Sequence, residues 1–372
     1  MTAARLLSRG ASATPVRIVG TGLLGTSIGL ALRELGVDVV LANRSPAALR
    51  LAIDYGAGRE ATPDDTPGLV IVAVTPDVTA DVVAAELAAH PDALVTDVAS
   101  VKAGILNELV ARGADVTRYL GSHPMAGRER GGAISARADI FLGRPWVITP
   151  HAATTAEQER TLEDLALDLG STPIRLSPDE HDRGVALVSH VPQVVASLLA
   201  ARLLSASDTV PSLAGQGLRD TTRIASSDPE LWIQILAANA GPVGEVLHGF
   251  RDDLDAVIQA LENPTGPGAP TRIAATLTRG NQGVARIPGK HGGDDRYATL
   301  VVQVADEPGE LARLLTEIGE EGVNMEDLRL EHSPGAQIGF AEIAVLPSAV
   351  HTLAEALTAR GWSLAESSGS GR

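Results

Sequence analysis

Three glycines near the N-terminus have the spacing of a phosphate-binding loop. They stand in Arg17-Ile-Val-Gly-Thr-Gly-Leu-Leu-Gly-Thr26, between an apolar run and a segment with helical periodicity. One glycine makes a tight turn, the next lets the backbone approach a pyrophosphate, and the third lets the helix pack on the strand. The helix N-terminus then faces the phosphates. The pattern predicts dinucleotide contacts from Gly20, Gly22, Leu23, Leu24 and Gly25.

The residues after the second apolar run bear on the choice of dinucleotide. An acidic residue there would hold the ribose 2′-hydroxyl and repel a 2′-phosphate, but this chain has Asn43-Arg44-Ser45. Arg44 can pair with the extra phosphate and Ser45 can donate a hydrogen bond. These residues favour NADP, while NAD and a merely solvated Arg44 stay open. Thr75 and Pro76 complete the expected cofactor contacts.

Two polar motifs follow later strands of the expected sheet. They are Val95-Thr-Asp-Val-Ala-Ser-Val-Lys102 and Gly121-Ser-His-Pro-Met-Ala-Gly127. Open α/β sheets build their sites beyond the carboxyl ends of strands, so Ser100 and His123 are expected to face one another beside the nicotinamide. A histidine is largely neutral at pH 7 and can take a proton there. The alternative for His123 is a hydrogen-bonded loop histidine without a catalytic role.

The elements that must position these residues alternate along the first half of the chain. Apolar runs separated by helical patterns predict a wound α/β sheet, with a helix over Leu23–Leu35. The expected strands are Val16–Gly20, Val37–Ala42, Leu69–Val74, Leu94–Asp97, Tyr119–Gly121, Trp146–Thr149 and Pro173–Leu176. Beyond residue 179 the stretches Val185–Leu204 and Glu230–Leu261 are rich in Ala and Leu without strand-like alternation, which predicts a helical domain.

A Pro/Gly cluster at Asn263–Pro270 predicts the clearest boundary in the chain. After it, a block of about 70 residues has the order strand, helix, strand, strand, helix, strand, which fits a ferredoxin-like module. The expected elements are Ala298–Val304, Gly309–Glu320, Asn324–Glu331, Gln337–Val345, Ala349–Arg360 and a short last strand. The predicted organisation is a disordered tail (1–15), a Rossmann-type domain (16–178), an all-α domain (179–262), a linker (263–295), the βαββαβ domain (296–366) and a tail (367–372).

Composition excludes several classes of function. The 372 residues include 46 Asp and Glu against 30 Lys and Arg, a formal charge of −16. So acidic a surface disfavours nucleic acid and anionic membranes. There is no cysteine, so thiolate metal sites and cysteine nucleophiles are ruled out, and we expect no metal. The N-terminus lacks the apolar stretch of a secretory signal, so the expected location is the cytoplasm. Only Lys102 and Lys290 are lysines in a chain that otherwise uses arginine, which hints at a demand for a compact ammonium.

Five motifs in register carry a resemblance. The glycine loop, the two motifs around Ser100 and His123, Ser189-His190-Val191-Pro192, and Thr222-Arg-Ile-Ala-Ser-Ser-Asp-Pro229 together resemble the prephenate/arogenate dehydrogenase family of tyrosine biosynthesis, over about residues 16–262. The C-terminal block, with Asp306-Glu-Pro-Gly-Glu-Leu311 and Gly322-Val-Asn324, resembles an ACT domain, a small amino-acid-sensing module.

The resemblance implies a reaction and roles for residues. The family oxidises a cyclohexadienol at its carbinol carbon while carbon dioxide leaves the opposite ring position. His123 would accept the hydroxyl proton and Ser100 would hydrogen-bond the same hydroxyl. Arg223 would bind a substrate carboxylate, for which a guanidinium fork is suited. The other implied pocket residues are Glu129, Ser189, His190 and Gln193. Two chains would interlock through their helical domains as a homodimer.

Several alternatives stay open. Gln193 stands where prephenate-using relatives often carry a histidine, and glutamine cannot become cationic, so this residue leaves the choice between prephenate and arogenate open. Glu129 could pair with the ammonium of arogenate, and prephenate is the favoured substrate of the two. One alternative is a β-hydroxyacid dehydrogenase, a family that commonly carries a catalytic lysine in the helical domain, whereas Lys102 and Lys290 both lie outside that domain here. Another alternative is a nucleotide-binding amino-acid sensor without catalytic activity, which would have no use for Ser100, His123 and Arg223. The ACT block is expected to bind tyrosine through Asp306, Pro308, Gly309 and Asn324, with another aromatic amino acid or a purely structural role as alternatives.

Overall fold

A computed structural model describes residues 14–127, 131–207, 209–287, 297–332 and 338–365. The chain divides into two compact units, residues 1–250 and 251–372. Each unit has its own buried apolar clusters.

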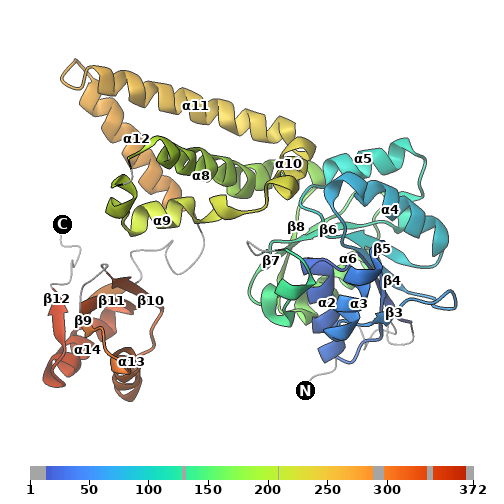
Figure 1. Cartoon of the computed structure of the whole chain (residues 1–372), viewed down its shortest axis with the longest axis horizontal. Helices are drawn as coiled ribbons and strands as arrows, with labels where there is room; N and C mark the ends of the chain where they lie inside the picture. The colour runs from blue at the N-terminus through green and yellow to red at the C-terminus, as the bar shows by residue number, and fades with distance from the viewer. Residues whose placement is uncertain (1–13, 128–130, 208, 288–296, 333–337, 366–372) are drawn as a thin grey trace. The chain divides into compact units, whose positions relative to one another are not determined.

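The first unit begins with a parallel sheet of five strands in the order β3-β2-β1-β4-β5 (Figure 1). The strands are β1 (Val16–Val19), β2 (Val39–Ala42), β3 (Arg59–Glu60), β4 (Leu69–Val72) and β5 (Leu94–Asp97). The chain leaves β1 toward β2 on one side and later returns to β4 on the other. A crevice therefore opens beyond the carboxyl end of β1, where ligands of such sheets bind.

Helices cover both faces of this sheet. They are α2 (Leu23–Glu34) and α3 (Pro46–Asp54), followed by α4 (Pro76–Ala89) and α5 (Ala103–Ala111). Strand β4 is buried at all four positions, as expected for a strand covered on both sides. Its side chains alternate between two clusters: Leu69 and Ile71 pack with the α2–α3 side, whereas Val70 and Val72 pack with the α4–α5 side.

A second sheet, of order β6-β7-β8, follows in the same unit. It contains β6 (Gly121–Pro124), β7 (Pro145–Thr149), helix α6 (Ala156–Asp168) and β8 (Thr172–Arg175), with short 3₁₀ turns η2 (Val116–Arg118), η3 (Ala133–Ser135) and η4 (Ala138–Phe141). Strand β6 is antiparallel to β7, and β7 is parallel to β8. The first part of the chain therefore forms two sheets rather than one.

The predicted strand Tyr119–Gly121 is wrong in its position. The strand starts at Gly121 and includes Ser122, His123 and Pro124, whereas Tyr119 makes only an isolated bridge to Val95. His123 pairs with Val147 of β7, so it lies within a strand and not in the loop beyond one. Polar residues and proline have low strand propensity, and pairing with a neighbouring strand overrode that preference.

The helical part follows as predicted. It contains α7 (Pro178–Val185), a π-helical turn η5 (Ala186–His190), α8 (Val191–Arg202), η6 (Leu203–Ser205), η7 (Val210–Leu213), α9 (Gln216–Thr222), η8 (Arg223–Ser226), α10 (Pro229–Ala238) and α11 (Ala240–Glu262). Helix α7 begins with a capping box between Ser177 and Glu180, and Pro178 occupies its first turn, a favourable start for a helix. Ala186, Val191 and Val243 form the small core of this region.

The helical run over residues 178–205 has the length and mean hydropathy, 1.6, of a membrane-crossing segment, and a third of its most apolar window is buried. Core helices of globular proteins meet the same criterion. The buried side chains of this run include the polar groups of His181, Asp182, His190 and Gln193, which belong to the site considered next.

The second unit corrects the predicted linker. Ala269–Val284, inside the expected linker 263–295, form helix α12. Only residues 263–268 turn the chain, and Pro270 falls in the first turn of α12, where it replaces an N–H that would have no partner anyway. An ion pair of 2.7 Å joins Arg279 to Asp253 on α11.

The C-terminal part is a four-stranded antiparallel sheet of order β10-β11-β9-β12 (Figure 1). Its elements are β9 (Ala298–Ala305), α13 (Glu310–Glu320), β10 (Asp327–His332), β11 (Ile338–Val345), α14 (Pro347–Ala359) and β12 (Ser363–Ala365). The predicted element order is present. Asn324, expected to open the second strand, lies three residues before β10. Glu326 still belongs to the turn, and its N–H donates to the carbonyl oxygen of Ala344 on β11.

Candidate active site

The glycine loop lies at the crevice beyond β1. Gly20 has φ +100°, and a Cβ there would collide with the carbonyl oxygen of Ala73; a Cβ at Gly25 would collide with the carbonyl oxygen of Gly20. Both positions therefore require glycine for close packing. At Gly22 nothing lies within 4 Å of the place a Cβ would take, so the backbone there is open to a ligand.

The start of α2 fits a dinucleotide pyrophosphate. Gly22 is the N-cap of α2 and provides no side-chain cap, so the first N–H groups at Leu23 and Leu24 are available to an anion. Beyond β2, Asn43 donates from Nδ2 to Thr21 on the glycine loop. These contacts hold the two loops of a dinucleotide site together.

The remaining predicted cofactor residues have local roles that the structure shows. Ser45 accepts a hydrogen bond from the Ala48 N–H and caps α3, while Arg44 beside it is exposed. Thr75 is the N-cap of α4 and Pro76 is its first residue. The hydroxyl oxygen of Ser45 is thus committed as an acceptor, and Arg44 is the cation that reaches solvent beyond β2.

His123 is buried and joined to the helical part of the unit. Its Nδ1 lies 2.9 Å from Nε2 of His181, and Nδ1 of His181 lies 2.8 Å from Oδ1 of Asp182. Burial lowers the pKa of His123 well below its usual value, and the nearby His181, Lys102 and His190 lower it further by repulsion. His123 is therefore neutral at pH 7, the state in which an imidazole can accept a proton.

A second group of buried polar side chains lies beside this pair. Asp97, at the end of β5, accepts from Tyr119 at 2.7 Å and from the Ala99 N–H at 2.9 Å, and it forms an ion pair with Lys102. The carboxylate of Asp182 accepts from the backbone N–H groups of Lys102 and Ala103, at 2.8 and 2.9 Å. These bonds tie α7 to the start of α5.

His190 lies on the π-helical turn and is buried. Its Nδ1 is 3.1 Å from Nδ2 of Asn239, which also donates to the backbone carbonyl of Asp182, and its ring meets Trp232 edge to face. Burial lowers the pKa of His190 to about 4. Gln193, one turn further on, is also buried. His190 therefore belongs to the same polar network as His123.

The other predicted substrate residues lie in different surroundings. Ser100 is half-buried between β5 and α5, and Ser189 is half-buried on the π-helical turn. Arg223 is exposed at the start of η8. Glu129 lies outside the described residues.

Sequence reasoning missed four members of the network: Asp97, His181, Asp182 and Asn239. A signal for two of them was present, because His181 is four residues before the buried Val185 and so shares its helical face.

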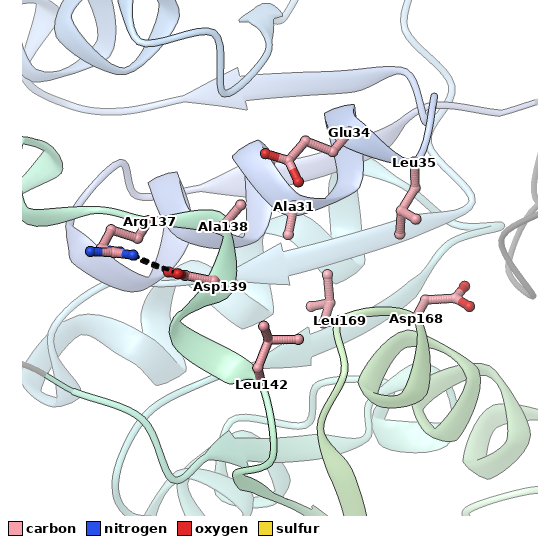
Figure 2. Close-up of a pocket in the computed structure, with 9 residues that line it drawn as sticks. All are labelled: Ala31, Glu34, Leu35, Arg137, Ala138, Asp139, Leu142, Asp168 and Leu169. Carbon is pink, nitrogen blue, oxygen red and sulfur yellow. Dashed lines mark hydrogen bonds and ion pairs between the residues drawn. The ribbon is translucent and has the colours of Figure 1, made fainter. Parts of the chain in front are cut away.

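Figure 2 shows a separate hollow of about 450 Å³ at the other end of α2. It is lined by Ala31, Glu34, Leu35, Arg137, Ala138, Asp139, Leu142, Asp168 and Leu169. It therefore lies beyond the C-terminus of the helix whose N-terminus carries the glycine loop, and the network around His123 contributes nothing to it.

A glycine loop at the crevice of a parallel sheet, a helical region after it, and a neutral buried histidine between them define a nicotinamide-dependent oxidoreductase with a Rossmann-type domain. Residues 28–174 match the family described as prephenate dehydrogenase, nucleotide-binding domain, and residues 177–272 match prephenate dehydrogenase, dimerization domain. The probable prephenate dehydrogenase NovF of Streptomyces niveus is 36% identical over 353 residues, covering 93% of this chain and 98% of NovF. The chain belongs to the prephenate dehydrogenase family.

Solved structures agree with this assignment. Arogenate dehydrogenase of Synechocystis is 26% identical, with a TM-score of 0.61 over 73% of this chain and 100% of that one. Prephenate dehydrogenase of Aquifex aeolicus, solved with hydroxyphenyl propionate and NAD+, has a TM-score of 0.65 at 24% identity, over 72% of this chain and 98% of that one. The second likeness shows the shared fold.

Proposed function

We propose that the protein is a prephenate dehydrogenase, which converts prephenate to 4-hydroxyphenylpyruvate and carbon dioxide. The observation that carries this proposal is the neutral, buried His123, whose Nδ1 is bonded to His181. Its Nε2 is then the atom that accepts the proton of the substrate 4-hydroxyl, with Ser100 hydrogen-bonding the same oxygen. Bound nicotinamide supplies the hydride acceptor. Family membership and the 36% identity to NovF support the assignment.

The substrate carboxylates need cations and hydrogen-bond donors. Arg223 offers a guanidinium fork for one of them. Ser189, His190 and Gln193 lie on consecutive turns of one helical run and form the wall that the substrate side chain meets. Glu129 is proposed at the mouth of the same pocket.

Arogenate is the second candidate substrate. Gln193 is neutral where a histidine could carry charge, and the arogenate dehydrogenase of Synechocystis is 26% identical to this chain. The purified enzyme should be incubated with prephenate and with arogenate, each with NAD+ and with NADP+, while the absorbance of reduced nicotinamide is followed. Prephenate is expected to give the larger kcat/KM. A larger value for arogenate would reassign the substrate, and no turnover with either would refute the proposal.

The cofactor is proposed to be NADP. Exposed Arg44 follows β2, and the sequence there, Asn43-Arg44-Ser45, places no carboxylate to repel a 2′-phosphate. NAD is the alternative, and the same four assays distinguish the two.

The enzyme is proposed to be a cytoplasmic homodimer. Helical side chains that are large, apolar and exposed in the single chain support pairing through this region; they include Leu187, Val188, Leu198, Leu199 and Leu213. The match of residues 177–272 to a dimerization domain also supports pairing with a second copy of the chain. Light scattering of the purified protein should give twice the mass of one chain.

The C-terminal sheet is proposed to be an ACT domain that binds tyrosine. Asp306 and Pro308 lie in the exposed turn after β9, and Gly309, with φ +97°, caps α13 without a side chain. The N–H groups that follow can bind a carboxylate. Asn324 is exposed and donates to Glu326 at 2.7 Å, a bond that an amino-acid ligand would replace.

Tyrosine inhibition tests this regulatory role. A chain ending at Ile287 keeps α12 and removes the C-terminal sheet, so it is expected to stay active and to lose sensitivity to tyrosine. Coupling between sites is commonly worth about 1–3 kcal/mol. Tyrosine also resembles the product and can compete at the active site, so inhibition is compared at saturating prephenate. Equal inhibition of both chains, with no tyrosine bound by the isolated C-terminal sheet in calorimetry, would refute the role.

A further inference from the structure

The side chains of Asp182, His181 and His123 form a continuous hydrogen-bonded series. The two joining distances are 2.8 and 2.9 Å, and all three side chains are buried. The series links α7 of the helical region to β6, the strand that carries the proposed base. It is the most direct connection between His123 and a fixed charge among the hydrogen bonds of the described residues.

The proton positions follow from the last member of the series. Asp182 accepts hydrogen bonds from two backbone N–H groups, of Lys102 and Ala103. Burial raises the pKa of its carboxyl, but the hydrogen bonds from His181 and from these two N–H groups outweigh burial and lower the pKa. A carboxylate can only accept. Nδ1 of His181 must therefore carry a proton and donate a hydrogen bond to Asp182.

The protonation of the two rings then has one consistent solution. Burial lowers the pKa of His181 as well as that of His123, so each ring is neutral and holds one proton. His181 has its proton on Nδ1, so its Nε2 accepts. His123 must donate from Nδ1, which leaves its Nε2 without a proton.

We propose that His181 and Asp182 are positioning residues that hold His123 in the tautomer with the proton on Nδ1 and the lone pair on Nε2. The inference deepens the proposed function, since a proton acceptor is useful only to a reaction that removes a proton. An isolated neutral imidazole favours the opposite tautomer, with the proton on Nε2. The series fixes both the tautomer and the angle of the ring.

Among the residues that the structure describes, the other ionisable groups near His123 already have partners of their own. The charged and titratable groups around it are Lys102 on the approach to α5 and His190 on the π-helical turn. Lys102 is committed to Asp97, and His190 is hydrogen-bonded to Asn239. His181 is therefore the acceptor that determines where the proton of His123 resides.

Histidine NMR tests the tautomer without reference to activity. Two-bond 15N–1H correlation spectra of the uniformly labelled enzyme distinguish Nδ1–H from Nε2–H rings, and the spectra of His123→Asn and His181→Gln assign the two signals among nine histidines. Both His123 and His181 are expected as neutral Nδ1–H rings at pH 7. An Nε2–H ring at His123 would overturn the inference.

Kinetics test its consequence. His181→Leu keeps the volume but offers no acceptor, so kcat is expected to fall about 100-fold or more, in the range of losing a general base or its orientation. His181→Gln places an amide oxygen near the former Nε2 and should recover at least 10-fold of that loss. KM for prephenate and the Kd of the dinucleotide should change less than 3-fold in both variants.

The exposed His351, whose Nε2 lies 3.3 Å from the carboxylate of the exposed Glu355, provides the matched control. His351→Leu should leave kcat unchanged. A kcat of His181→Leu within 3-fold of the wild type would refute the positioning role, as would equal losses in the Leu and Gln variants. If His181→Leu does not fold, the positioning role is still tested by the NMR tautomer of His123 in the wild type and by the kcat of His181→Gln. Absence of any dehydrogenase activity in the wild type would refute the proposed function, whereas the NMR result would stand by itself.

Discussion

Lys102 and Asp97 form an ion pair in which both side chains are buried from solvent. Tyr119 and the N–H of Ala99 also donate hydrogen bonds to this carboxylate. The space around the lysine is narrow, since a Cβ at Gly121 would lie 3.1 Å from Cδ of Lys102. The ammonium of Lys102 is a compact charge, unlike the planar guanidinium of the arginines used elsewhere in the chain.

Lys102→Met is expected to lower the free energy of unfolding by about 3–5 kcal/mol, because it leaves the Asp97 carboxylate buried without its counter-charge. Denaturant unfolding followed by circular dichroism measures the change. The double variant Lys102→Met/Asp97→Asn removes both charges and should be more stable than the single one. A loss below about 1 kcal/mol in Lys102→Met would contradict the argument.

His123→Asn is expected to lower kcat by about 10² to 10⁴, the usual cost of losing a general base. The Kd of the dinucleotide should stay within about twofold, because the glycine loop does not use His123. Steady-state assays and fluorescence titration measure the two quantities. Wild-type turnover in this variant would remove His123 from the mechanism.

The pH dependence follows from the lowered pKa of His123. Only the neutral ring accepts a proton, and burial keeps its pKa below the ordinary 6.5. The value of kcat/KM should therefore be constant from pH 7 down to 6.5 and decline at lower pH. A profile that already falls between pH 7.5 and 6.5 would show an unshifted base.

Arg44→Ala is expected to weaken NADP about 10- to 150-fold, because a charge-assisted contact to phosphate is worth roughly 1.5–3 kcal/mol. NAD has no 2′-phosphate, so its Kd should hardly change. Arg50→Ala, an exposed arginine on α3, is the control for a general loss of positive charge. Equal weakening of both dinucleotides by Arg44→Ala would assign the residue to folding.

Arg223→Ala is expected to raise KM for prephenate and to change kcat less, because a carboxylate contact made in both the ground and transition states is uniform binding. Arg219→Ala, also exposed and one turn earlier in α9, serves as the control. A large fall in kcat at constant KM would assign Arg223 to the chemical step.

Much of the fold could be predicted because its signals are local. The apolar runs at Leu69–Val72 and Leu94–Asp97, and the glycines before α2, specify their elements within a few residues of sequence. Strand β6 could not be placed correctly, since Ser122, His123 and Pro124 owe their extended backbone to pairing with β7. Helix α12 was concealed by the prolines and glycines that precede it.

The site was predictable only in part for a similar reason. Gly20, His123 and His190 stand in motifs, whereas Asp182 and Asn239 acquire their roles from contacts across the fold. Asn239 reaches the backbone carbonyl of Asp182 and the ring of His190 by two hydrogen bonds, across 57 and 49 residues of sequence. No periodicity in sequence encodes such a contact.

The bond between His123 and His181 has a consequence for how the parts of this enzyme can be exchanged. A fragment ending before Ser177 would contain the whole glycine loop and could still hold a dinucleotide. In that fragment His123 would have no acceptor for its Nδ1 proton. Grafting a foreign helical half onto this nucleotide-binding half would therefore yield a working dehydrogenase only if the graft brings its own imidazole and carboxylate to the same place.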